Sequence, residues 1–79
     1  MSSEIESVVK ASINCQFLQI DLAGNHCTVN IVSDEFEELN TVKRHQKVYK
    51  ALNDRIVSGE LHAVNINAFS SMEEMENSG

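Results

Sequence analysis

Two histidines and a cysteine stand where a small domain could bind a metal. His62 opens the stretch "HAVNINAF", in which apolar and polar residues alternate as in a β-strand. His26 and Cys27 follow the turn segment "AGN" and open a second alternating stretch. Imidazole nitrogen and thiolate sulfur are common ligands of transition metals and clusters. If the two strands are neighbours, these ligands could converge on one ion or cluster at one end of a sheet.

Each of these residues also has a purely structural interpretation. Strand parity puts His62 in one row with Val64 and Ile66, so it is expected to face the core as a half-buried histidine bonded to a carbonyl. Parity also sends Cys27 to the apolar side and His26 to the opposite face. Two ligands alone make an incomplete site, so a metal role requires further ligands from a partner or a small molecule.

A second candidate site is the basic segment "VKRHQKVYK". On a helix, Lys43, Lys47 and Lys50 form one exposed stripe, with Arg44 beside it. The stripe is either a solvated helix face or a phosphate-binding surface, since each neutralised phosphate releases a counterion. The formal net charge of −6 argues against broad coating of nucleic acid or membranes.

Length and composition limit the possible functions. The 79 residues fit a single domain, 1–79, with an ordered core at about 3–70 and a frayed C-terminal tail. We expect no membrane span and no signal peptide. The two cysteines then indicate reduced thiols in a cytosol rather than a disulfide framework. No nucleophile-elbow or metalloprotease spacing is present, so an enzyme is not expected.

Hydrophobic periodicity predicts the elements that must position these residues. The order is α-β-β-α-α-β-α, which we expect to form an α+β fold with a three-stranded sheet and helices on one face. In the long helix, apolar spacing predicts a buried stripe of Val42, His45, Tyr49, Leu52 and Ile56. The predicted elements are a helix at 3–14, strands at 16–22 and 26–33, a short helical turn at 33–39, a helix at 41–58, a strand at 60–69 and a last helix after 70.

Capping and turn residues mark the boundaries of these elements. Gly24-Asn25 can make the tight turn of a hairpin, and Gly59 stands where a helix ends in a left-handed residue. The predicted helix starts are a capping box of Ser3 with Glu6, Ser33, Asn40, and a second capping box of Ser70 with Glu73.

The segments "VKRHQKVYKAL" and "LHAVNINAFS", with Gly59 between them, resemble the BolA family over about residues 4–74. The histidine in "GNHC" makes the sequence resemble the bacterial IbaG-like branch of that family. The resemblance implies a fold like class II KH domains and a non-enzymatic role in iron–sulfur cluster trafficking. It also implies a partnership with monothiol glutaredoxins of the CGFS type, with which a [2Fe-2S] cluster is shared.

The resemblance also implies a ligand set. Carried over by position, His62 and His26 would bind the cluster, with Cys27 as the less favoured substitute for His26. The glutaredoxin would supply a cysteine and its bound glutathione a second thiolate, and the isolated protein would hold no cofactor. The basic helix 41–58 would serve as a docking face or, in the alternative function of a transcriptional regulator, bind duplex DNA. We expect a bacterial cytoplasmic protein that is monomeric when free.

Overall fold

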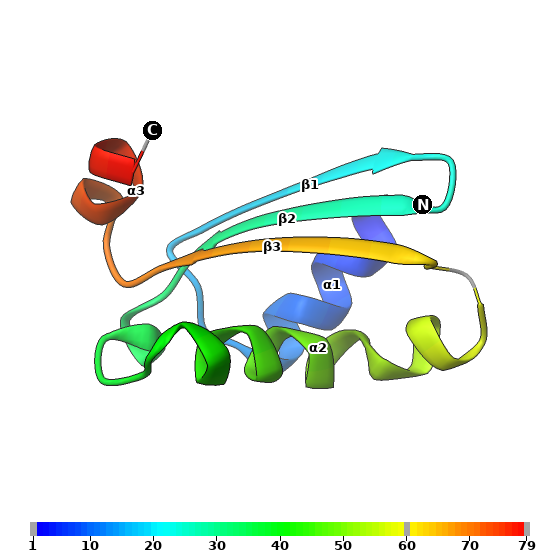
Figure 1. Cartoon of the computed structure of the whole chain (residues 1–79), viewed down its shortest axis with the longest axis horizontal. Coiled ribbons are helices and arrows are strands. Elements are labelled where there is room, and N and C mark those ends of the chain that lie inside the picture. Colours follow the sequence, from blue (N-terminus) through cyan, green and yellow to red (C-terminus); the bar gives the residue numbers. More distant parts are fainter. Residues whose placement is uncertain (1, 60, 79) are drawn as a thin grey trace.

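One mixed sheet of three strands organises the chain, and α1 and α2 pack on one of its faces (Figure 1). The computed structural model describes residues 2–59 and 61–78. The strands lie in the order β1-β2-β3, with β1 antiparallel and β3 parallel to β2. This arrangement confirms the predicted α+β fold. The elements are α1 (Ser2–Ser12), β1 (Phe17–Ala23), β2 (His26–Val32), the 3-10 helix η1 (Asp34–Phe36), α2 (Thr41–Val57), β3 (Ala63–Phe69) and α3 (Met72–Ser78).

The hairpin between β1 and β2 closes through a two-residue turn. Ala23 pairs with His26, and Gly24 between them has φ of +63°. Asn25 keeps a negative φ. A positive φ at the first central residue alone is typical of a type II′ turn, whose twist suits a hairpin. The turn therefore fixes the register along the whole strand pair.

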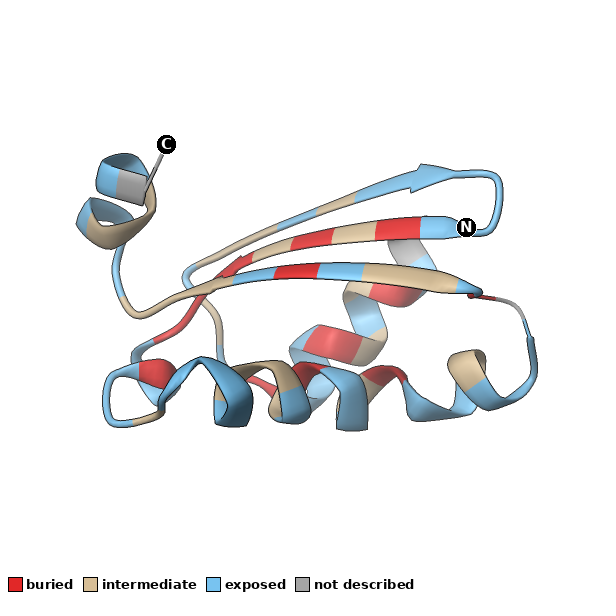
Figure 2. Cartoon of the chain, viewed as in Figure 1, coloured by how far each residue is buried: buried red, intermediate tan, exposed pale blue. Residues whose placement is uncertain are grey.

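The core lies between the sheet and the two long helices, and every other residue of β2 points into it (Figure 2). Burial of each aliphatic side chain contributes about 1.5–3 kcal/mol to stability. The core cluster consists of Ile5 and Val9 of α1, Ile13 just after it, Cys27, Val29 and Ile31 of β2, Val48 and Leu52 of α2, and Phe36, Leu61 and Ile66.

The predicted buried stripe of α2 is confirmed at Leu52, which is completely buried, and at Ile56, which packs against the core, but it is wrong at Val42. Val42 is 63% exposed and Tyr49 is 42% exposed, whereas Val48 is completely buried. A second inward row, which the prediction missed, runs from Arg44 through Val48 to Leu52 at i,i+4 spacing. Apolar residues alone could not reveal this row, because its first member is an arginine whose charge is satisfied inside the fold.

The caps fit the sequence at three of the predicted positions. Ser33 accepts a hydrogen bond from the Glu35 main-chain N–H, and Asn40 accepts one from the Lys43 N–H at 2.9 Å. Gly59 has φ of +84°, as expected after a helix.

Other predicted boundaries shift by one to three residues. α1 ends at Ser12 rather than at 14. The last capping box moves by one residue, because Ser71 accepts from the Glu74 N–H. The side chain of Ser3, in the first predicted box, lies outside the described part, as does Glu60 at the start of the predicted last strand.

Candidate functional site

The two candidate histidines lie at the same end of the sheet. Because β2 and β3 are parallel, both strands begin there, and His26 pairs in register with Ala63. His62 immediately precedes that pair, and its N–H donates to the carbonyl of Asn25 in the hairpin turn at 3.0 Å. The Ala63 N–H shares the same acceptor at 3.4 Å. One main-chain carbonyl thus ties the hairpin turn to the start of β3.

Both imidazoles are exposed to solvent. The expectation that His62 faces the core is therefore wrong; Leu61 is buried there instead, with 4% of its surface exposed. His62 is exposed because it precedes the first residue of β3 and so lies beyond the part of the strand that the core covers. Parity holds for Val64 and Ile66, which face the helices.

The two rings approach the end of the sheet from different sides. His26 alternates with Cys27 and so lies on the face away from the helices. His62 lies on the helix side, since its Nε2 would be 3.9 Å from a Cβ placed on Gly59 at the end of α2. A metal bound by both rings would have to lie beyond the strand ends rather than over one face of the sheet.

Cys27, the alternative ligand, is part of the core. Its side chain is completely buried, between Leu22 of β1 and Val64 of β3 in the strand register. Burial raises the pKa of this thiol, so the protonated form is favoured. Within residues 2–59 and 61–78, no group of three or more His, Cys, Asp or Glu is arranged to hold a metal ion.

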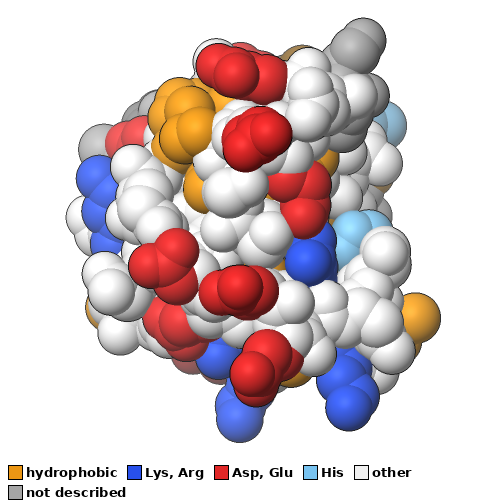
Figure 3. Space-filling view, turned by 90° about the vertical axis from the view of Figure 1, so that its left-hand side faces the viewer, with side chains coloured by type: hydrophobic (Ala, Val, Ile, Leu, Met, Phe, Trp, Pro, Cys, Tyr) orange, Lys and Arg blue, Asp and Glu red, His pale blue; other side chains and the backbone are white. Residues whose placement is uncertain are grey.

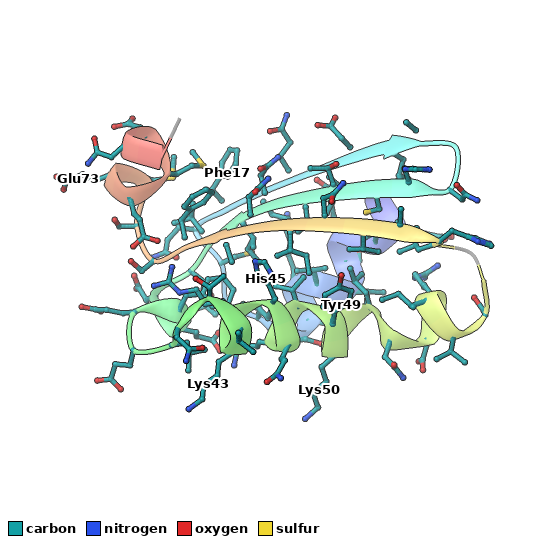
Figure 4. All side chains as sticks on the ribbon, viewed as in Figure 1. Phe17, Lys43, His45, Tyr49, Lys50 and Glu73 are labelled. Atoms are coloured by element: carbon teal, nitrogen blue, oxygen red, sulfur yellow. The ribbon has the colours of Figure 1, made fainter. Side chains whose placement is uncertain are left out.

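The predicted basic surface comprised four residues, which differ in how their side chains lie on α2. Lys43 and Lys50 are exposed and point away from the sheet, whereas His45 and Tyr49 point from α2 toward it (Figure 4). Lys47 instead forms an ion pair with Glu35 at 2.9 Å. The hydrogen bond from Lys47 lowers the pKa of the Glu35 carboxyl, with a further contribution from the Asn14 N–H.

Arg44, the fourth predicted surface residue, is an internal connector with its side chain only 15% exposed. Its Nε donates to the carbonyls of Phe36 and Leu39 at 3.0 and 2.9 Å. Its Nη1 donates to the carbonyl of Ala68 at 3.2 Å and to Glu74 Oε1 at 2.6 Å. One guanidinium therefore joins η1, α2, β3 and α3. Sequence reasoning missed this role, although the i,i+4 spacing to buried Val48 and Leu52 is a signal for it.

Acidic side chains gather at the end of the molecule opposite the two histidines. Figure 3 views this end, where red carboxylates surround α3 and the start of α2. The Ser70 hydroxyl donates to Glu74, and this bond together with that from Arg44 lowers the pKa of the Glu74 carboxyl. The exposed acids at this end include Asp34, Glu35, Glu37, Glu38, Glu73 and Glu76. Lys and Arg side chains lie among these carboxylates in the same view, and two of them, Arg44 and Lys47, pair with Glu74 and Glu35.

Comparisons with known proteins agree on one family. A family model described as BolA-like protein matches residues 5–73. The acid stress protein IbaG of Escherichia coli (strain K12) is 32% identical over 72 residues, covering 91% of this chain and 86% of that protein. No helix in the described part of the chain is long and apolar enough to cross a membrane.

Solved structures show the same fold. BolA1 from Arabidopsis thaliana has a TM-score of 0.75 and 30% identity, over 85% of this chain and 87% of that one. The BolA domain of SufE1 from Arabidopsis thaliana has a TM-score of 0.81 and 29% identity, over 90% of this chain and 92% of that one. Sequence and structure together show that the chain belongs to the BolA-like family.

Proposed function

We propose that the protein is a cytoplasmic iron–sulfur adaptor, which shares a [2Fe-2S] cluster with a monothiol CGFS glutaredoxin through His62 and His26. The observation that supports this most is the parallel start of β2 and β3, which brings the positions of two exposed imidazoles to one end of the sheet. BolA-family proteins are generally not enzymes, in keeping with a binding role.

The donor set fits such a cluster. A [2Fe-2S] cluster takes four protein or small-molecule ligands, and pairs of histidines replace pairs of thiolates in Rieske-type centres. His62 and His26 would supply the two nitrogens, while the glutaredoxin cysteine and glutathione would supply two thiolates. Neutral imidazoles bind without the cost of removing a buried thiol proton, which Cys27 would incur.

Binding requires the two rings to turn toward each other around the end of the strands. His62 precedes β3, and its main-chain N–H, not its ring, makes the bond to Asn25. Its side chain can therefore change rotamer without breaking a bond of the sheet. His26 stands at the first position of β2 and is also exposed. The backbone would stay in place while the side chains complete the site.

The test is reconstitution with a CGFS glutaredoxin, iron, sulfide and glutathione, followed by visible absorption and circular dichroism. We expect His62→Ala and His26→Ala each to change the spectrum of the heterocomplex and to speed loss of the cluster. His45→Ala is the matched control, because His45 is the third histidine and lies on α2. Spectra unchanged in both ligand variants would show that the assignment is wrong.

Binding of duplex DNA by α2 is the second candidate. The exposed, outward-pointing Lys43 and Lys50 favour it, whereas the internal bonds of Arg44 and the Lys47–Glu35 pair oppose it. DNA affinity that falls steeply with salt and is lost on reversing the charge of Lys50 would support this function. Undetectable binding at low salt would exclude it.

A further inference from the structure

We propose that the outer edge of β1 pairs with β1 of a second copy of this chain, in an antiparallel register centred on Ile20. The two sheets would then join into one continuous sheet with a two-fold axis through the paired strands. Neither candidate metal ligand takes part, so this inference is independent of the proposed function. It assigns a role to the one long strand edge that the fold leaves uncovered in the described part of the chain.

The two edges of the sheet differ in how far side chains cover their main-chain groups. At the β3 edge, side chains of α2 bond to two of the outward main-chain carbonyls: Tyr49 Oη donates to the carbonyl of Val64 and Arg44 Nη1 to that of Ala68, each at 3.2 Å. Such side-chain cover blocks the addition of another strand. β1 is the outermost strand on the other side, and no helix runs along its outer edge (Figure 1).

The hairpin geometry determines which main-chain groups of β1 are available. A two-residue turn closes on a hydrogen-bonded pair, here Ala23 with His26, and hydrogen-bonded pairs then alternate along the strands. The N–H and C=O groups of Leu18, Ile20 and Leu22 consequently point away from β2. Among the described residues, no side chain bonds to these six groups. They form a ready pairing edge of three residues.

The sequence of β1 is complementary to itself about Ile20. In that register Ile20 pairs with its own copy and Leu18 with Leu22, which aligns all the outward main-chain groups in hydrogen-bonded pairs. Shifting the register by two residues in either direction loses part of these bonds. On the other face of the sheet, Gln19 lies opposite Asp21 of the second copy, and an amide can donate to a carboxylate. Leu22, which is 37% exposed, would gain an apolar neighbour.

The pairing should be weak, because a single strand edge buries less surface than a standard stable interface. The net charge of −6 on each copy also opposes association. We therefore expect a dissociation constant of about 0.1–1 mM at near-physiological salt, and tighter pairing as salt screens the repulsion. The protein would be a monomer when dilute and a dimer when concentrated.

Sedimentation equilibrium with the full chain, at concentrations up to about 2 mM, tests the proposal. Gln19→Asp places two like-charged pairs across the interface and should weaken dimerisation about 3- to 30-fold. Gln19→Lys places two opposite-charged pairs there and should strengthen it. Asn65→Asp is the matched control, because it makes the same charge change at an exposed position on β3. It should leave the constant within about twofold of that of the parent protein, since the added charge is screened at that distance.

Amide chemical shifts on dilution give the location of the contact. The proposal expects concentration-dependent shifts at Leu18, Ile20 and Leu22, with the same behaviour in His62→Ala. A protein that stays monomeric at the highest concentration would overturn it, as would shifts confined to α2 or β3. Equal responses of Gln19→Asp and Asn65→Asp would also overturn it, because they would show only the effect of net charge.

Discussion

Replacement of Arg44 by alanine should destabilise the fold more than any other alanine replacement on the exposed or half-exposed surface of α2. The side chain is 15% exposed and bonds to three main-chain carbonyls and one carboxylate. Those carbonyls belong to Phe36, Leu39 and Ala68, so a single truncation loosens η1, the start of α2 and the end of β3 together.

The magnitude follows from the kinds of bond that are lost. A hydrogen bond to a charged group contributes about 1.5–3 kcal/mol, but water can reach part of this site and replace some of what is lost. The ion pair adds less than about 1 kcal/mol, because the Glu74 side chain is 41% exposed. We expect a net loss of about 3 kcal/mol, which for a domain of this size lowers the Tm by about 12–24 °C.

Urea and thermal unfolding followed by far-UV circular dichroism would measure this loss. Lys43→Ala is the matched control, since Lys43 is the neighbouring basic residue and its side chain is exposed; it should change stability by less than about 0.5 kcal/mol. Arg44→Lys should fall between the two, because an ammonium keeps the charge but lacks the planar fork. A loss in Arg44→Ala no larger than in Lys43→Ala would refute the reasoning.

Two further predictions concern thiols and acid. In the native protein a maleimide should label half-buried Cys15 faster than Cys27, because burial leaves the Cys27 thiol enclosed and protonated. In urea the two labelling rates should converge. Equal rates in the native protein would contradict the core position of Cys27. The folded-state pKa values of Glu35 and Glu74 lie below their ordinary value of 4.5, so their stabilising contribution is present above that pH and is lost as pH falls through the folded values. The Tm should therefore drop on acidification below about pH 4.5, as differential scanning calorimetry can measure. The double variant E35Q/E74Q should have a lower Tm at neutral pH, and its Tm should fall less on acidification.

The fold could be predicted from sequence because local signals agreed with one another. Alternation in β1 and β2, the glycine turn and the caps at Ser33 and Asn40 each act over a few residues, so they can be read without knowing the tertiary structure. The inward row of α2 that begins at Arg44 could not be read in this way. Only the positions of distant carbonyls explain why an arginine lies there.

In the candidate site, too, the features set by local sequence could be predicted and those set by tertiary contacts could not. The common sheet end of His26 and His62 follows from two strands being neighbours, which the sequence suggested but could not orient. Exposure of His62 was missed, because alternation was extended one residue beyond the start of β3. The partial neutralisation of the basic helix was missed as well, since Glu35 lies on a different element from Lys47.

The Asn25 carbonyl, which accepts from both the His62 and the Ala63 N–H, holds the hairpin turn at a fixed distance from the start of β3. The spacing between the histidine positions is set by main-chain bonds over a few residues, and hardly at all by how the interior is filled. Substitutions that reshape the interior should leave that spacing intact, whereas insertion of a single residue between Ala23 and His26 would displace one ligand relative to the other.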